Sequence, residues 1–363
     1  MKAKKIIVHI IALVLMGLIL VLGLIEGVGW RVYDGALLYV MAAIMVVSGL
    51  IGGYLVHNLL HECGHALLAR LSGARVMEVA FWGLVFAKGR VSFSARSTYA
   101  GWTAFVPKRP QDAAKGLTLS LAGGAIGSMV SLIILFAVTL IFNLFEDFHG
   151  LLIMSGAMGS IVYMICVNFL SGADGTDGRL LMGRPGERSL FWTKVVLLEC
   201  QSHMLNGKSL KEIEKPFFDV SLLKRYVTVC DVMLGLSLGD IGLAERLIDA
   251  YLKQPVFDDN EHIALLLCKM LTAISKDDGP GVDALYNRTG WAILSDIDDP
   301  LVLLCSYAYK KYTGDLQWAD AVKKTLLRSV YGYPLTGYGK TVMEIYTALY
   351  GQDSPENGHT GAK

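Results

Sequence analysis

The sequence has little charge of either sign. Asp, Glu, Lys and Arg make up 18% of its 363 residues, and the formal net charge is +1. A nucleic-acid-binding protein carries an excess of basic residues, so no nucleic acid is expected among the partners. The six cysteines stand singly, without a Cys-x-x-Cys pair. This spacing indicates neither a disulfide framework nor a cysteine zinc site, and the cysteines beyond residue 183 predict a reducing compartment.

Apolar residues are abundant instead. They make up 53% of the chain, and the mean hydropathy is +0.48. Stretches with almost no charge reach the roughly 20 residues that cross a bilayer as a helix, and four of them predict membrane spans: residues 6–25, 36–60, 116–145 and 150–173. The first follows a basic start and could be a signal peptide, but it is long and no small-x-small cleavage site follows it. It therefore predicts a retained signal anchor.

Basic residues between the spans predict the orientation. The segment 70–115 contains eight of them, Arg70, Arg75, Lys88, Arg90, Arg96, Lys108, Arg109 and Lys115, against Glu78 and Asp112. Loops rich in Lys and Arg stay in the cytosol, so this segment and both termini are expected there. The absence of organelle signals favours the plasma membrane of a bacterium.

From about residue 184 the sequence changes to amphipathic helical segments broken by Gly, Pro and Asp. This predicts a transmembrane domain over 1–183 and a cytosolic all-α domain over 184–363. The phrase at 239–245, Gly-Asp-Ile-Gly-Leu-Ala-Glu, returns at 314–320 as Gly-Asp-Leu-Gln-Trp-Ala-Asp, with a weaker breaker at 277–279. Such spacing is typical of stacked helical hairpins of the tetratricopeptide kind, although an irregular helical domain would fit equally well.

A metal-binding motif lies near the end of the second predicted span. His61, Glu62 and His65 form His-Glu-x-x-His. Residues four apart share a helix face, so both imidazoles can bind one Zn²⁺ while Glu62 acts as general base on a water molecule. His57 shares the face, but two further turns, about 12 Å of helix, separate it from His65. A role beside the ligands or in helix packing therefore suits His57 better. A buried polar cluster without a metal is the alternative for the whole motif.

Catalytic zinc usually has three protein ligands, so a further one is expected from elsewhere. The fourth span ends near Asn168 and is followed by Asp174-Gly175 and Asp177-Gly178, on the same side of the membrane as the histidines. Asp177 is the favoured ligand because a helix can begin directly after it, although it could equally be the cap of that helix. Asp174 lies in a Gly-rich stretch and suits a turn.

In these motifs the sequence resembles the site-2 protease family of intramembrane zinc metalloproteases over about residues 36–183. The resemblance implies that His61, His65 and Asp177 bind zinc, that Glu62 is the general base, and that Asn168 holds the substrate near the metal. Asn168 could instead make an interhelical hydrogen bond. The small-residue stretch 120–127 is similar to the third core helix of the family. The sequence departs from the family in lacking its Pro between Asn168 and Asp177, and in having Gly123-Gly124 where a Gly-Pro is often found.

Residues 76–95 predict a small β-hairpin with a turn near Lys88 and Gly89. Its edge could pair with an extended substrate, or the hairpin could cover the site as a lid. The fold class expected is thus a mainly α-helical polytopic membrane protein with a small β element.

The expected function is hydrolysis of peptide bonds in membrane-embedded or membrane-proximal protein segments. A cytosolic protein would be a further partner through the helical domain. The alternative is a membrane adaptor without protease activity, in which the metal site is structural or lapsed.

Overall fold

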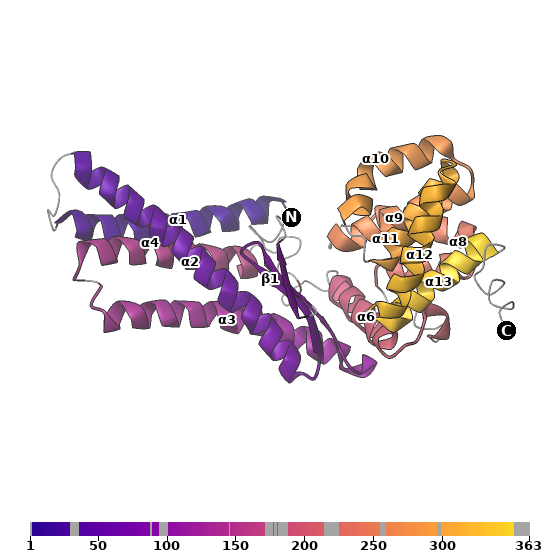
Figure 1. Cartoon of the computed structure of the whole chain (residues 1–363). Coiled ribbons are helices and arrows are strands. Elements are labelled where there is room, and N and C mark those ends of the chain that lie inside the picture. The colour runs from indigo at the N-terminus through magenta and orange to yellow at the C-terminus, as the bar shows by residue number, and fades with distance from the viewer. Residues whose placement is uncertain are drawn as a thin grey trace. The chain divides into compact units, whose positions relative to one another are not determined.

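The computed structural model describes residues 2–29, 36–87, 89–93, 101–144, 146–170, 177, 180, 188–213, 225–254, 259–295 and 299–351. The chain divides into two compact units (Figure 1). The first comprises 1–106 and 114–188, and the second comprises 107–113 and 189–363.

Long apolar helices build the first unit. They are α1 (Lys2–Gly29), α2 (Ala36–Leu71), α3 (Ala113–Ile141) and α4 (Phe148–Ile165). The described residues contain four segments long and apolar enough to cross a membrane: Ile6–Glu26, Ala36–Leu71, Pro110–Ile141 and Phe148–Phe169. Only 11% of the first segment and 28% of the second and third are buried, as expected for helices surrounded by lipid, whereas 50% of the fourth is buried because α4 packs against α1 and α2. The prediction of a mainly α-helical membrane protein is confirmed.

The second span is longer than predicted because nothing in the sequence stops the helix at residue 60. α2 continues over 36 residues and carries the His-Glu motif within it. It ends where Gly73 adopts φ +88°, and the amide N–H of Ala74 donates to the carbonyl of Ala69. Glycine takes this left-handed conformation without a steric penalty and so closes the helix. α2 runs obliquely to α1 and α4 (Figure 1), and it packs against α4.

The predicted hairpin is a four-stranded antiparallel sheet of order β3-β2-β1-β4. Its strands are β1 (Arg75–Phe81), β2 (Leu84–Ala87), β3 (Arg90–Phe93) and β4 (Trp102–Val106). The turn at Gly89 joins β2 to β3 as expected, whereas Lys88 lies outside the described residues. A second turn at Trp82-Gly83, both with positive φ, separates β1 from β2. β4 was missed because its five residues become a strand only by pairing with β1.

The second unit is all-helical. Its elements are α6 (Arg188–Leu205), η4 (Leu210–Glu212), α7 (Val229–Ser237), α8 (Ile241–Leu252), α9 (Asp259–Ser275), α10 (Gly279–Ser295), α11 (Pro300–Tyr312), α12 (Leu316–Gly332) and α13 (Thr336–Tyr350). α8, α10 and α12 begin 38 and 37 residues apart. Each follows a residue with positive φ and an aspartate whose side chain accepts an amide N–H of the helix; these aspartates are Asp240, Asp278 and Asp315.

The helical hairpins close on themselves. α7 contacts α9, α9 contacts α11, α11 contacts α13, and α13 contacts α7. In an open solenoid each repeat contacts only its neighbours, so the first and last repeats stay apart. Here α13 packs against α7 as well as against α11, so the last helix contacts the first helix of this group. The resulting apolar core includes Cys200, Cys230, Cys268 and Cys305. These free thiols are buried and pack as small apolar side chains.

Candidate metal centre

Glycines allow α3 to approach the His-Glu motif of α2. A methyl group on Gly64 would overlap the carbonyl of Gly123, and one on Gly127 would overlap the carbonyl of Leu60. The backbones of the two helices are therefore in direct contact at the motif. Packing of this kind requires small residues on the contacting faces, which explains the small-residue stretch in α3.

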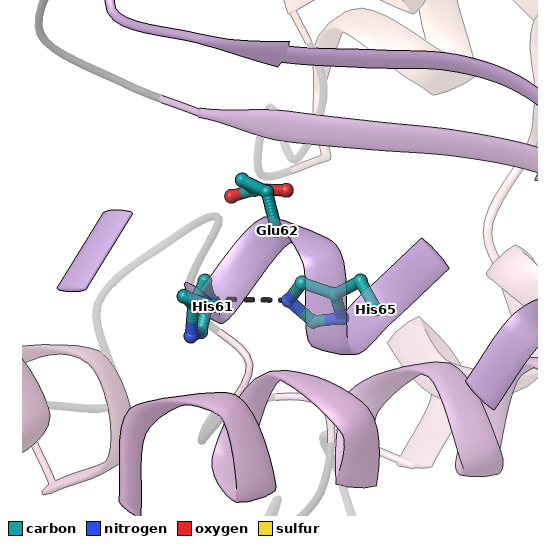
Figure 2. Close-up of side chains that lie close together, drawn as sticks. All are labelled: His61, Glu62 and His65. Carbon is teal, nitrogen blue, oxygen red and sulfur yellow. Dashed lines mark hydrogen bonds between the residues drawn. The ribbon is translucent and has the colours of Figure 1, made fainter. Parts of the chain in front are cut away.

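The two histidines of the motif are held in defined orientations by α3. The Nδ1 atom of His65 lies 2.7 Å from the carbonyl oxygen of Ser120, and Nδ1 of His61 lies 3.0 Å from that of Gly124 and 2.9 Å from the hydroxyl of Ser128. A carbonyl only accepts, so each Nδ1 carries a hydrogen, and a neutral imidazole with this tautomer offers the lone pair of Nε2 to a metal. These two Nε2 atoms are 3.1 Å apart and face one another (Figure 2).

Asp177 joins this pair. Its Oδ2 atom lies 3.2 Å from Nε2 of His61 and 3.1 Å from Nε2 of His65. A carboxyl group binds a metal in its ionised form, so this oxygen would join the two imidazole nitrogens as a carboxylate. Asp174, the competing aspartate, lies outside the described residues.

The three atoms fit the ligand set of a tetrahedral metal ion. With bonds of about 2.0–2.1 Å, two ligands of zinc lie about 3.3 Å apart, close to the distances of 3.1 to 3.2 Å between these atoms. Two nitrogen lone pairs and a carboxylate oxygen repel one another unless a cation or a proton lies among them. Gly124 leaves this space clear, because a methyl group there would overlap His65 and lie 2.9 Å from Oδ2 of Asp177.

Glu62 is buried beside the histidines and engages a different partner. One ligand atom from each of His61, Glu62 and His65 lies within 4.8 Å of the others. The Glu62 carboxylate lies on the side of the helix nearer the strands (Figure 2), where its Oε2 accepts a hydrogen bond of 2.8 Å from the hydroxyl of Thr103 in β4. Glu62 thus hydrogen-bonds to β4 while its carboxylate stays close enough to the two histidines to act at the same centre.

Asn168 reaches the same centre from the end of α4. Its Nδ2 atom lies 3.0 Å from Nε2 of His61 and 3.5 Å from Oδ2 of Asp177, and its Oδ1 accepts from the amide N–H of Asp177. It sits in a π-helical turn, η3 (Cys166–Leu170), a distortion that is frequent at functional sites. Asn168 therefore makes an interhelical contact and also lies beside the candidate metal ligands, and a role in holding substrate stays a prediction.

His57 lies one turn away from the three converging atoms. Its Nδ1 atom lies 3.4 Å from the hydroxyl of Ser131, and its ring stacks on that of His61 with centroids 5.6 Å apart. It packs against the ring of His61 without joining the convergence of Nε2 atoms and Oδ2. This placement agrees with the helix geometry argued from the sequence.

The sequence alone did not reveal the residues that support these side chains. Ser120, Gly124 and Ser128 contact the histidines, and Thr103 contacts Glu62. The α3 residues had one signal, because 120, 124 and 128 recur every fourth position and so share a helix face. Thr103 had none, since only the pairing of β4 with β1 brings it to α2.

Comparison of the chain with protein-family models, with curated proteins and with solved structures finds no match.

Proposed function

We propose that the protein is an intramembrane zinc metalloprotease of the site-2 protease kind, which hydrolyses peptide bonds in membrane-embedded or membrane-proximal protein segments. The observation that carries this proposal is the convergence of His61, His65 and Asp177 at distances suited to one metal ion. Glu62 stands beside them and hydrogen-bonds to Thr103. Three protein ligands plus an adjacent carboxylate are the arrangement of hydrolytic zinc sites, which leave one position open.

A zinc ion held by these residues would supply a Lewis acid that polarises the substrate carbonyl and lowers the pKa of water toward 7. Glu62 accepts a proton as the water oxygen bonds to the carbonyl carbon. It then delivers that proton to the amide nitrogen as the C–N bond breaks, so that a carboxylic acid and an amine result. Ser120, Gly124 and Ser128 keep the imidazoles oriented throughout, and Asn168 can donate its amide N–H to the substrate beside His61.

Four apolar helices support residence in a membrane. We propose that this membrane is the plasma membrane of a bacterium. The eight basic residues in the segment 70–115 favour a cytosolic location of that segment and of both termini. The lipid bilayer and a membrane protein substrate are then its main partners.

The all-helical unit is proposed to bind a cytosolic protein or to restrict substrate entry. The rival function is an adaptor with a structural metal site. The presence of the Glu62 carboxylate beside the proposed ligands argues against it. A structural zinc site is closed by four ligands and has no use for an unligated, buried carboxylate.

Proteomics of membrane fractions tests the proposal. Cells that carry the wild-type protein are compared with cells that carry Glu62→Gln, at matched expression. A membrane protein fragment that is present only with the wild type supports the proposal and identifies a substrate. Identical fragment patterns in the two strains would reject protease activity.

A further inference from the structure

Thr103 hydrogen-bonds to the proposed general base, Glu62. Among the described residues, no other residue of the sheet forms a hydrogen bond with Glu62. The Thr103 hydroxyl lies 2.8 Å from Oε2 of Glu62 and 3.2 Å from the Glu62 backbone carbonyl oxygen. The first distance is that of an ordinary hydrogen bond from a hydroxyl group to an oxygen acceptor. Thr103 is 41 positions away from Glu62 and in a different secondary-structure element, so this contact depends on how the sheet is seated.

The sheet holds Thr103 firmly in this place. In β4, Thr103 pairs with Val79 of the neighbouring strand β1. Gly101 brings the start of β4 close to α2, because a Cβ atom there would lie 2.6 Å from Cγ and 2.7 Å from Oε1 of Glu62. Because glycine precedes the first residue of β4, the strand can begin directly over the carboxylate.

A glutamate needs such support to act as a base. Its terminal torsion is broad, so an untethered carboxylate samples many orientations, only some of which direct a lone pair at the reacting water. A hydrogen bond to one oxygen restricts the torsion and aims the other oxygen. Misplacement of a catalytic group by about 1 Å costs up to a hundredfold in rate.

We propose that Thr103 is a positioning residue, which holds Oε2 of Glu62 so that the carboxylate is aligned for proton transfer. This inference rests on the proposed protease function. It makes the small sheet a part of the catalytic apparatus, in addition to any role in covering the site or in binding substrate.

The test uses the purified full-length protein and the substrate identified by the Glu62-dependent fragment. Thr103→Val removes the hydroxyl and keeps the shape, Thr103→Ser keeps the hydroxyl, and Thr118→Val is the matched control. Thr118 is exposed, and within the described part of the chain its hydroxyl donates to the carbonyl of Ala114 in its own helix. We expect Thr103→Val to lower kcat about 10-fold to 100-fold, with KM and zinc content unchanged, whereas Thr103→Ser and Thr118→Val retain wild-type kcat.

Two outcomes would overturn the inference: a kcat of Thr103→Val within twofold of wild type, or an equal loss in Thr103→Ser, which would assign the effect to packing. If Thr103→Val does not fold, Thr103→Ala replaces it with the same expectation. Failure of the proposed function itself is distinguishable, because the wild type and Glu62→Gln would then show the same fragments before any Thr103 variant is made, and the inference would fall with it.

Discussion

The Nδ2 atom of Asn168 lies 3.0 Å from the Nε2 atom of His61, although 107 positions separate the two residues. The end of α4 and the motif of α2 therefore meet at one point. The same point receives Oδ2 of Asp177, 3.2 Å from His61. Two segments that are remote in the chain thus supply one polar centre among apolar helices.

Glu62→Gln should keep zinc and abolish turnover, because the side chain is a base and not a ligand. His61→Ala and His65→Ala should lose the metal as well as the activity. Zinc per chain is measured by elemental mass spectrometry on the purified variants, together with cleavage of the identified substrate. Undiminished cleavage by Glu62→Gln would reject this mechanism.

Asp177→Ala should lower zinc affinity by more than the roughly 10–100-fold that accompanies loss of a residue supporting a ligand. Asp177 contributes an oxygen 3.1 Å from Nε2 of His65. Asp174→Ala is the matched variant, three positions earlier, and should leave zinc in place with a milder loss of activity. Zinc titration of the two variants measures their zinc affinities. A larger loss in Asp174→Ala than in Asp177→Ala would assign the ligand role to Asp174.

Gly124→Ala should displace the His65 ring and reduce zinc occupancy. A methyl group at this position overlaps the imidazole and approaches Asp177, and forcing such a group into a packed site costs about 1–3 kcal/mol. Gly52→Ala in α2 is the control, since a methyl group there meets nothing within 4 Å. Equal zinc content in the two variants would show that α3 does not pack against the metal centre as described.

Asp231→Ala should destabilise the helical unit by about 3–5 kcal/mol, because it leaves the buried Arg225 guanidinium without its carboxylate. The Nη2 atom of Arg225 lies 2.7 Å from Oδ1 of Asp231, and the two side chains are 0% and 3% exposed. Lys276→Ala breaks the exposed pair with Glu245 and should cost less than about 1 kcal/mol. Urea unfolding of the detergent-solubilised protein compares them, and similar midpoints would contradict the burial of the first pair.

The orientation predicts that the exposed residue Lys108 faces the cytosol. In a cysteine-free background, Lys108→Cys should resist a membrane-impermeant maleimide in intact cells and react after the membrane is opened. A reporter fused after residue 363 should likewise be active only in its cytosolic form. Labelling of the Lys108→Cys variant from outside the cell would reverse the orientation and move the metal centre to the other face.

The sequence was a good guide to the elements whose signals are local. Apolar runs predicted the four spans, and the four-residue separation of His61 and His65 placed both imidazoles on one face of α2. The ends of these elements were less well predicted, because α2 stops at the left-handed Gly73 and not where its apolar run ends. β4 was missed, since a strand of five residues is defined by the partner it pairs with.

The sequence by itself determined that this is a helical membrane protein with a His-Glu-x-x-His motif, because hydropathy and helical period are properties of neighbouring residues. Only the tertiary structure decided that Asp177 and Asn168 reach His61, that α3 orients both imidazoles, and that Thr103 holds Glu62. These contacts join segments far apart in the chain. They depend on helix crossings at Gly64 and Gly123 and on strand pairing, which no local pattern of residues encodes.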